Sequence, residues 1–209
     1  MTHRKRKIIN NQIISISFYM IIEESNSGKA EILVIGDEVV SGLIFDSNSK
    51  YLGERIYELG VGVSHITKIG DDFAIIKECI EKALKRSDWI ILTGGLGITH
   101  DDITKSVVMN VFNSKLRRDE KVKAMIQKVY AKRNREIPES LHSQCEVPDN
   151  CQVLYNEMGT APGFRYEKGG RVLFCLPGVP HEMKHLFEKY IGPELVQNTS
   201  KTFLQRILK

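Results

Sequence analysis

Apolar and polar positions alternate along this chain in a way that favours strands linked to helices. Residues 31–35 and 89–92 are short apolar runs, and residues 61–69 alternate with a period of two. Each segment stops at a loop with glycine or aspartate. Short apolar runs with such ends are typical of buried parallel strands, and period-two alternation is typical of half-buried strands. We therefore predict three strands here, with His65 partly buried in the alternating one.

Between and beyond these strands, apolar residues recur at helical spacing. Residues 134–150 are instead polar and irregular, and the lysines of the helix before them are interpreted as a solvated face. Strands that alternate with helices through short links predict a three-layer α/β/α domain with a mainly parallel sheet. The predicted helices are 46–59, 76–84, 103–111, 119–133 and 181–190, and two further strands are 153–155 and 172–176.

The strand predicted at residues 89–92 runs into a loop that contains Gly94, Gly95 and Gly97, and Asp101 and Asp102 follow. Glycine permits positive φ and close approach of a ligand, while loop N–H groups and a helix N-terminus favour an anion. Carboxylates beside a bound phosphate would repel it, so they indicate a bridging cation or a proton transfer. These residues favour a metal-assisted site for a phosphorylated small molecule. The alternative is a tight turn whose acidic residues are stabilised by the helix dipole.

Polar clusters follow four of the predicted strands. They are residues 36–38, residues 70–72, the glycine loop with Asp102, and residues 177–180. Ligands of open parallel sheets bind outside the carboxyl ends of the strands. The convergence of four strand ends therefore predicts one pocket, formed by segments that lie far apart in the sequence.

Composition sets limits on size and partners. The 209 residues are 42% hydrophobic and 27% charged, which suits one globular domain with room for a short appendage. The net charge is +4, but four of the 30 basic residues lie within residues 1–7, so the rest balance the 26 acidic residues. A neutral body gives no reason to expect a nucleic-acid partner.

Residues 1–29 are predicted to be an extension outside the domain. The apolar stretch at 13–22 loosely resembles a signal peptide, but polar residues 10–12 interrupt it and acidic residues 23–24 occupy the cleavage region. We interpret the extension as sequence upstream of a start at Met20, or as a loose arm or added strand. No apolar segment reaches the ~18 residues of a membrane span, so we expect a cytoplasmic protein with no membrane partner.

The four cysteines show no C-x-x-C spacing. Cys79 and Cys175 lie in apolar patterns and are predicted to be buried thiols. Cys145 and Cys151 are close enough in sequence to permit a disulfide, but nothing requires one. This cysteine usage fits a reducing compartment such as the cytosol.

Residues 181–185 read His-Glu-Met-Lys-His, which matches the zinc-protease motif H-E-x-x-H. The spacing places His181 and His185 on one helix face. The motif lies in the first turn after Pro180 rather than in a long helix, and no third ligand is evident. A zinc hydrolase is one interpretation, and a surface helix start with Glu182 as a capping residue is the favoured one.

The run Thr93-Gly-Gly-Leu-Gly-Ile-Thr-His-Asp-Asp-Ile-Thr104 resembles the signature of the molybdopterin-binding (MoaB/Mog-like) domain. It is most similar to the version at the N-terminus of CinA, the competence/damage-inducible protein. The resemblance extends over residues 30–192 and implies an α/β/α fold that self-associates as a dimer or trimer. The other matching segments, in order, are Gly36-Asp-Glu38, Ser41-Gly42, Asp46-Ser-Asn48, Gly70-Asp71, Gly159-Thr-Ala-Pro-Gly163 and Leu176-Pro-Gly-Val-Pro-His-Glu-Met183.

The resemblance also implies ligands and site residues. Mog members transfer adenylate from ATP to molybdopterin with Mg²⁺, whereas CinA-type domains are linked to metal-dependent cleavage of ADP-ribose-like pyrophosphates. The related domain of eukaryotic FAD synthase is linked to FAD hydrolysis. By this resemblance Asp71 and Asp102 are catalytic and, with Asp101, hold a divalent ion, which is Mg²⁺ or else Mn²⁺ or Co²⁺. The residues expected to bind a nucleotide or pterin phosphate are Ser41, Asn48, Thr93, Gly94, Gly95, Leu96, Gly97, Thr160, Pro177 and Gly178.

Two departures from the family pattern change the expected function. Leu96 stands where Mog proteins usually carry threonine, which weakens the case for adenylyl transfer. No segment resembles the amidase-like C-terminal domain of CinA, so residues 193–209 are expected to be a tail that opens a truncated second region. We expect cleavage of a nucleotide pyrophosphate. The alternatives are molybdopterin adenylyl transfer and a non-catalytic, self-associating module that binds pterin or nucleotide.

Overall fold

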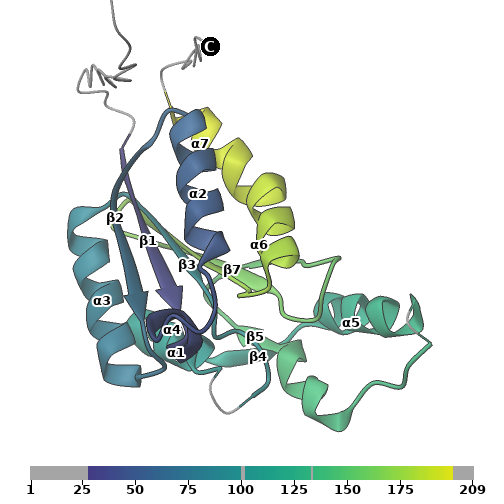
Figure 1. The fold of residues 1–209 in the computed structure, drawn as a ribbon. Helices are drawn as coiled ribbons and strands as arrows, with labels where there is room; N and C mark the ends of the chain where they lie inside the picture. The colour runs from purple at the N-terminus through teal and green to yellow at the C-terminus, as the bar shows by residue number, and fades with distance from the viewer. Residues whose placement is uncertain (1–27, 100–101, 133, 200–209) are drawn as a thin grey trace, which may run out of the picture.

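The computed structural model describes residues 28–99, 102–132 and 134–199 (Figure 1). Its main sheet contains the strands β1 (Lys29–Ile35), β2 (Gly62–Ile69), β3 (Trp89–Thr93), β6 (Gln152–Leu154), β7 (Gly163–Lys168) and β8 (Arg171–Leu176). Their order across the sheet is β2-β1-β3-β8-β7-β6. The first four in this order are parallel, while β7 runs antiparallel to both of its neighbours.

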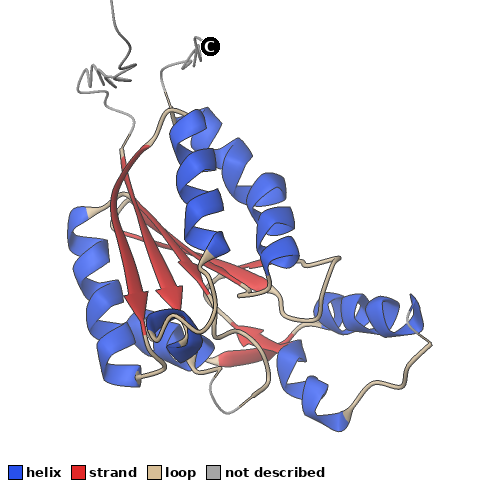
Figure 2. Cartoon of the chain, in the orientation of Figure 1, coloured by secondary structure: helices blue, strands red, loops and turns tan. Residues whose placement is uncertain are grey.

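Helices cover both faces of this sheet, as Figures 1 and 2 show. They are α2 (Ser47–Glu58), α3 (Phe73–Arg86), α4 (Thr104–Phe112), α6 (Pro180–Leu186), the π-helix η2 (Phe187–Ile191) and α7 (Gly192–Asn198). The short helix α1 (Asp37–Val40) has no buried residue and follows the carboxyl end of β1. The apolar residues of α2, α6, η2 and α7 form one core against the sheet, and those of α3 and α4 belong to a second core on its other side. The predicted three-layer α/β/α fold with a mainly parallel sheet is therefore confirmed.

Alternate residues of the central strands serve these two cores. On β1, Ile32 and Val34 pack on the α2 and α6 side, while Leu33 and Ile35 pack on the α3 and α4 side. All four side chains are at most 3% exposed. The strand is buried on both faces, which explains why its sequence is a continuous apolar run rather than an alternating one.

β2 is an edge strand, because it pairs with β1 alone. Ile69 is the one buried residue of this strand, Ile66 is 50% exposed, and His65 is exposed with its Nδ1 3.1 Å from Ser64 Oγ. The prediction of a partly buried histidine is therefore wrong. Alternation in sequence distinguishes two faces, but at the margin of a sheet both faces stay open to solvent.

A small lobe stands beside the main sheet (Figure 1). It contains α5 (Glu120–Lys132), the 3-10 helix η1 (Glu139–Cys145) and an antiparallel pair of strands, β4 (Leu116–Arg118) and β5 (Glu146–Pro148). Both η1 and β5 lie within residues 134–150, which the sequence analysis predicted to be irregular. Val122 of α5 and Val147 of β5 are fully buried, so the lobe extends the core on the α3 and α4 side.

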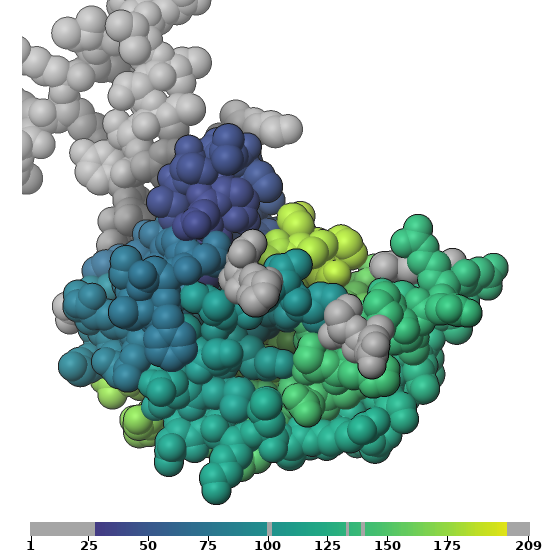
Figure 3. All heavy atoms as spheres, turned by 90° about the horizontal axis from the view of Figure 1, so that it is seen from below, coloured from purple at the N-terminus to yellow at the C-terminus, as the bar shows by residue number. Residues whose placement is uncertain are grey.

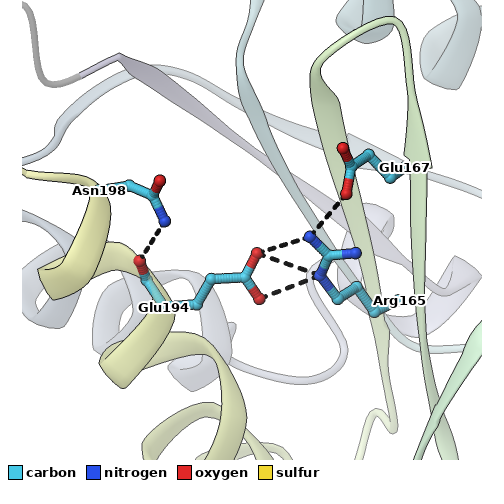
Figure 4. A network of polar contacts seen from close by, with 4 residues as sticks. All are labelled: Arg165, Glu167, Glu194 and Asn198. Atoms are coloured by element: carbon cyan, nitrogen blue, oxygen red, sulfur yellow. Dashed lines mark hydrogen bonds and ion pairs between the residues drawn. The ribbon is translucent and has the colours of Figure 1, made fainter.

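The C-terminal helices are tied to the sheet by an ion pair. Nε and Nη2 of Arg165 on β7 lie 2.7–3.1 Å from the carboxylate oxygens of Glu194 on α7, and Nη2 also contacts Glu167 (Figure 4). Leu195 on α7 is fully buried. The domain end predicted at residue 192 thus falls inside a continuous helical segment that runs from α6 to α7.

Residues 1–27 of the predicted extension and residues 200–209 of the predicted tail lie outside the described residues. All four cysteines are free thiols, of which Cys175 is buried as predicted and Cys79 is only half-buried. Within the described part of the chain, no helix has both the length and the apolar character needed to cross a bilayer.

Candidate functional site

The carboxyl ends of β1, β2, β3 and β8 meet at one end of the molecule, which Figure 3 views directly. A cleft of about 990 Å³ opens there. In this view the dark blue segment that contains α1 lies next to the yellow segment that follows β8. The cleft therefore lies where the parallel sheet predicted a ligand site.

Most of the residues that the sequence analysis assigned to the site come together in this cleft. Asn48 and Thr93 do not line it but lie behind it, and Asp101 lies outside the described residues. Those that line the cleft are Ser41, Asp71, Gly94, Gly95, Leu96, Gly97, Asp102, Thr160, Pro177 and Gly178.

The glycine loop follows a backbone path that other residues resist. Gly94 has φ +108° and Gly95 has φ +68°. A Cβ atom on Gly94 would lie 2.2 Å from the carbonyl oxygen of Ile35, and one on Gly95 would lie 2.3 Å from Thr104 Oγ1. These glycines let the loop pass directly against the end of β1 and the start of α4, so close packing fixes its shape.

Asp102 clamps this loop. Its Oδ1 accepts a hydrogen bond from the Gly97 N–H at 2.7 Å, and its Oδ2 accepts from the N–H and hydroxyl of Thr99 at 2.8 and 2.5 Å. An ionised carboxylate offers about four lone-pair positions, so these three bonds use most of its capacity. Asp102 therefore serves mainly to position the loop, and it retains about one acceptor position for a ligand.

Asp37 and Asp71 join the ends of β1 and β2 by reciprocal hydrogen bonds. The Asp37 N–H donates to Asp71 Oδ2 at 3.0 Å, and the Asp71 N–H donates to Asp37 Oδ1 at 3.1 Å. Gly70 leaves room for this pair, because a Cβ atom there would lie 2.4 Å from Asp37 Oδ1. Two carboxylates that are 34 residues apart in sequence are thereby held side by side in the cleft.

A buried polar network supports the wall of the cleft after β8. Asn48 Nδ2 donates to Thr93 Oγ1 at 3.1 Å and to the Gly178 carbonyl at 2.8 Å. The Thr93 hydroxyl donates to the Pro177 carbonyl at 2.9 Å. Asn48 and Thr93 are at most 8% exposed, so they shape the cleft from behind and do not line it. Within the described residues, Asn48 Oδ1 is buried without a hydrogen-bond partner.

Three carboxylates to which the sequence assigned no role also line the cleft, Asp37, Glu38 and Glu182. The first two belong to the polar cluster at residues 36–38, which was expected at this edge of the sheet because it directly follows β1. Glu182 belongs to the H-E-x-x-H match, and its Oε2 accepts a hydrogen bond from Asn156 Nδ2 at 2.6 Å. Among the residues that the structure describes, no three His, Cys, Asp or Glu side chains are grouped to hold a metal, so the zinc interpretation gains no third ligand.

Comparison with known proteins identifies the family. The chain matches the family model described as "Probable molybdopterin binding domain" over residues 31–197. The chain belongs to this family. It is 41% identical over 180 residues to a competence-damage inducible protein of Caldicellulosiruptor saccharolyticus. The aligned residues make up 86% of this chain and 44% of that protein. It is 39% identical to a CinA-like protein of Dictyoglomus thermophilum, with 87% and 44% covered. The chain thus spans less than half the length of these relatives.

Solved structures agree with this assignment. The protein CinA of Thermoplasma acidophilum, described as having unknown function, has a TM-score of 0.71 and 29% identity, covering 80% of this chain and 97% of that one. The tungsten cofactor synthesizing protein MoaB from Pyrococcus furiosus has a TM-score of 0.53 and 17% identity, with 83% and 98% covered. The second similarity shows a shared fold.

The cleft of this molybdopterin-binding-family domain is acidic. Its lining residues include five carboxylates and, in the described part of the chain, no lysine or arginine. Lys105, the first lysine after the glycine loop, instead donates to the carbonyls of Ser143 and Glu146 at 3.1 and 3.2 Å. Burial lowers the pKa of the Lys105 ammonium. The five carboxylates are Asp37, Glu38, Asp71, Asp102 and Glu182.

The donor set suits a cation that is shared with a bound phosphate. Carboxylate oxygens are the ligands that Mg²⁺ and Mn²⁺ prefer. Mg²⁺ is usually held by one or two protein carboxylates together with water and substrate phosphate oxygens, so three converging protein ligands are not required. Asp37 and Asp71 offer adjacent carboxylates for this purpose. Asp102 adds about one acceptor position.

Proposed function

We propose that the cleft binds a nucleotide or pterin phosphate and, with a divalent cation, cleaves a nucleotide pyrophosphate of the ADP-ribose or FAD type. One observation carries this proposal: a fixed glycine loop and five carboxylates line the same cleft, with no lysine or arginine among its described lining residues. Loop N–H groups favour a phosphate, whereas carboxylates repel it. A cation between them resolves this conflict.

The chain's own residues have distinct parts in this proposal. The N–H groups of Gly95 and Leu96 hold one phosphate, since those of Gly94 and Gly97 donate to the Leu176 carbonyl and to Asp102. Asp102 keeps the loop in shape through Gly97 and Thr99. Asp37 and Asp71 hold the cation. When bound, the cation neutralises charge that develops at phosphorus and lowers the pKa of an attacking water. Water adds to one phosphorus and the bridging P–O bond breaks, so ADP-ribose yields AMP and ribose 5-phosphate.

The test is to incubate the full chain with ADP-ribose or FAD and with Mg²⁺, Mn²⁺ or Co²⁺, and to separate the products by anion-exchange chromatography. We expect turnover that a chelator abolishes and that Asp71→Asn lowers about 100-fold or more. Asp72→Asn is the matched control, because Asp72 caps α3 through Ile75 N–H at 2.9 Å and asparagine caps equally well. Equal loss in both variants would contradict the proposal.

A second candidate is a binding module without catalysis. It is favoured by Asp102, which spends three hydrogen bonds on its own loop. Saturable binding of ADP-ribose or a pterin phosphate in calorimetry, with no turnover of any substrate, would establish it. Release of pyrophosphate from ATP with molybdopterin would instead indicate adenylyl transfer, for which Leu96 supplies no hydroxyl and is only 4% exposed.

We also propose that the protein self-associates. We expect a dimer or trimer in the cytoplasm. Leu43, which lines the cleft, and Phe45 are 83% and 80% exposed, and Ile44 is 58% exposed, so three consecutive apolar side chains face solvent. Sedimentation velocity of the full chain measures the oligomer, and a purely monomeric species at micromolar concentration would contradict this expectation.

A further inference from the structure

A second hollow lies apart from the cleft, between α5 and the segments around Tyr155 and Tyr190. Its volume is about 540 Å³, and none of its lining residues lines the cleft. Four of its side chains are lysines, and the single carboxylate that lines it is Glu157. We call this hollow the lysine groove, and its basic and aromatic members are Lys121, Lys128, Lys132, Lys189, Tyr155 and Tyr190.

Three of these lysines form a row on α5. Lys128 and Lys132 follow Lys121 by seven and eleven residues, so all three point from one side of the helix. At 1.5 Å per residue the row is about 16 Å long. None of the three makes an ion pair with a described residue, whereas Lys189 pairs with Glu157 at 2.9 Å across the groove. The groove therefore carries an excess of positive charge.

Two aromatic rings lie among these charges. Lys121 Nζ lies 5.9 Å from the centre of the Tyr155 ring, and Lys189 Nζ lies 5.2 Å from the centre of the Tyr190 ring. The Tyr155 hydroxyl donates to Asp119 Oδ2 at 3.3 Å, which anchors that ring to the start of α5. Both tyrosines are half-buried, so part of each side chain stays open to solvent.

We propose that the lysine groove binds single-stranded nucleic acid, with backbone phosphates along the lysine row and bases against the tyrosine rings. Basic grooves that follow a phosphate backbone, combined with aromatic platforms, are the usual means of binding single strands. A row of about 16 Å is long enough for a few nucleotides. The bases of a duplex are stacked inside it, so a duplex can contact the lysines with its phosphates but cannot stack its bases on the tyrosine rings. The neutral total charge of the chain conceals this local excess.

The test is fluorescence anisotropy of the full chain with a labelled oligothymidylate of about 12 nucleotides, a length within the site sizes of single-strand-binding proteins. We expect saturable binding that weakens steeply as salt increases. Lys128→Ala with Lys132→Ala raises Kd about tenfold and lowers the salt slope by about 0.7 for each lost phosphate contact. Tyr190→Leu, which keeps an apolar contact but removes the ring, raises Kd about fivefold.

The matched control is Lys77→Ala with Lys85→Ala on α3. This pair removes the same charge, forms no ion pair with a described residue, and lines neither hollow. A Kd change equal to that of the α5 pair would overturn the proposal, because binding would then follow net charge alone. Activity in the cleft serves as a second control and stays unchanged in the α5 variant.

Competition experiments distinguish single-stranded nucleic acid from single nucleotides, acidic protein segments and duplexes. Affinity that grows with oligonucleotide length supports the proposal, and a mononucleotide that competes as well as the oligomer overturns it. Equal competition by polyglutamate of matched charge also overturns it, since the groove would then take an acidic protein segment. A duplex of the same length is expected to bind more weakly, and equal affinity would show that the tyrosine rings are not used.

Discussion

The cleft and the lysine groove are two hollows of opposite charge on one nearly neutral chain. The cleft is built from backbone, with Gly94 packed on the end of β1 and Asp102 bonded to its own loop. Most of the positive charge of the groove comes from exposed lysines of α5, a helix whose apolar face is buried in the core independently of those lysines. Ligand binding and stability are therefore coupled in the cleft and separable in the groove.

Gly94→Ala is the strongest way to test the coupling in the cleft. The new Cβ atom would lie 2.2 Å from the Ile35 carbonyl oxygen, and φ of +108° is costly for alanine. We expect the free energy of unfolding to fall by about 3 kcal/mol or more, because backbone cannot yield as a flexible side chain would. Urea denaturation followed by circular dichroism measures this loss.

Gly169→Ala is the matched control for that substitution. Gly169 also has a positive φ, +59°, but a Cβ atom there meets nothing within 4 Å. Its expected loss is about 1 kcal/mol, the cost of the left-handed backbone alone. Equal losses at the two positions would mean that the glycine loop does not press on β1, and the proposed coupling would be lost with it.

Asp102→Asn tests the clamp with a smaller change. Asparagine presents one NH₂ group where the carboxylate oxygens now accept from Gly97 and Thr99, so one donor would face another. We expect the free energy of unfolding to fall by about 1–3 kcal/mol and most of the turnover in the cleft to be lost. Asp149→Asn is a suitable control, because among the described residues its Oδ1 accepts from the Lys115 N–H alone and an asparagine oxygen can replace it. A stable but inactive Asp102→Asn would assign Asp102 to the ligand rather than the loop.

The sequence predicted those parts of the fold that depend on local pattern. The runs at 31–35 and 89–92 became β1 and β3 because strands buried on both faces must be apolar throughout. The strands β4 and β5 were missed, since three-residue strands that pair across about 30 positions leave no periodicity to detect. His65 was misjudged because sequence does not show that β2 lies at the sheet edge.

The site was predictable to the level of strand ends but not of individual contacts. Asp71 and Asp102 do reach one cleft, yet nothing in sequence indicates that Asp37 pairs with Asp71. Such reciprocal bonds depend on the register of two strand ends. The lysines of α5 were interpreted as solvated, and helical spacing alone could not place Tyr155 and Tyr190 opposite them. Both hollows therefore depend on long-range placement.

Asp119 provides a pH test on the groove side. Burial opposes ionisation of this 6% exposed carboxyl, but hydrogen bonds from the Val122 and Lys121 N–H groups and from Arg117 outweigh it, so its pKa lies below the ordinary value. A lowered pKa in the folded state adds stability above the unfolded pKa of about 3.9, and this is lost as pH falls through the folded value. Unfolding curves from pH 7 to 2 should show Asp119→Asn less stable at neutral pH and converging with the parent in acid. A constant difference would contradict the shift.

The smallest change in the free energy of unfolding is expected at the lysine row of the groove, where the change in oligonucleotide affinity is large. Lys128→Ala with Lys132→Ala removes two exposed side chains that make no ion pair with a described residue, and alanine favours helix. We expect the free energy of unfolding in urea to change by less than about 0.5 kcal/mol, while oligonucleotide affinity falls about tenfold. A loss of stability comparable to that of Asp102→Asn would show that the lysine row supports α5 itself. The groove would then be as much a part of the fold as the cleft, and the contrast between the two hollows would fail.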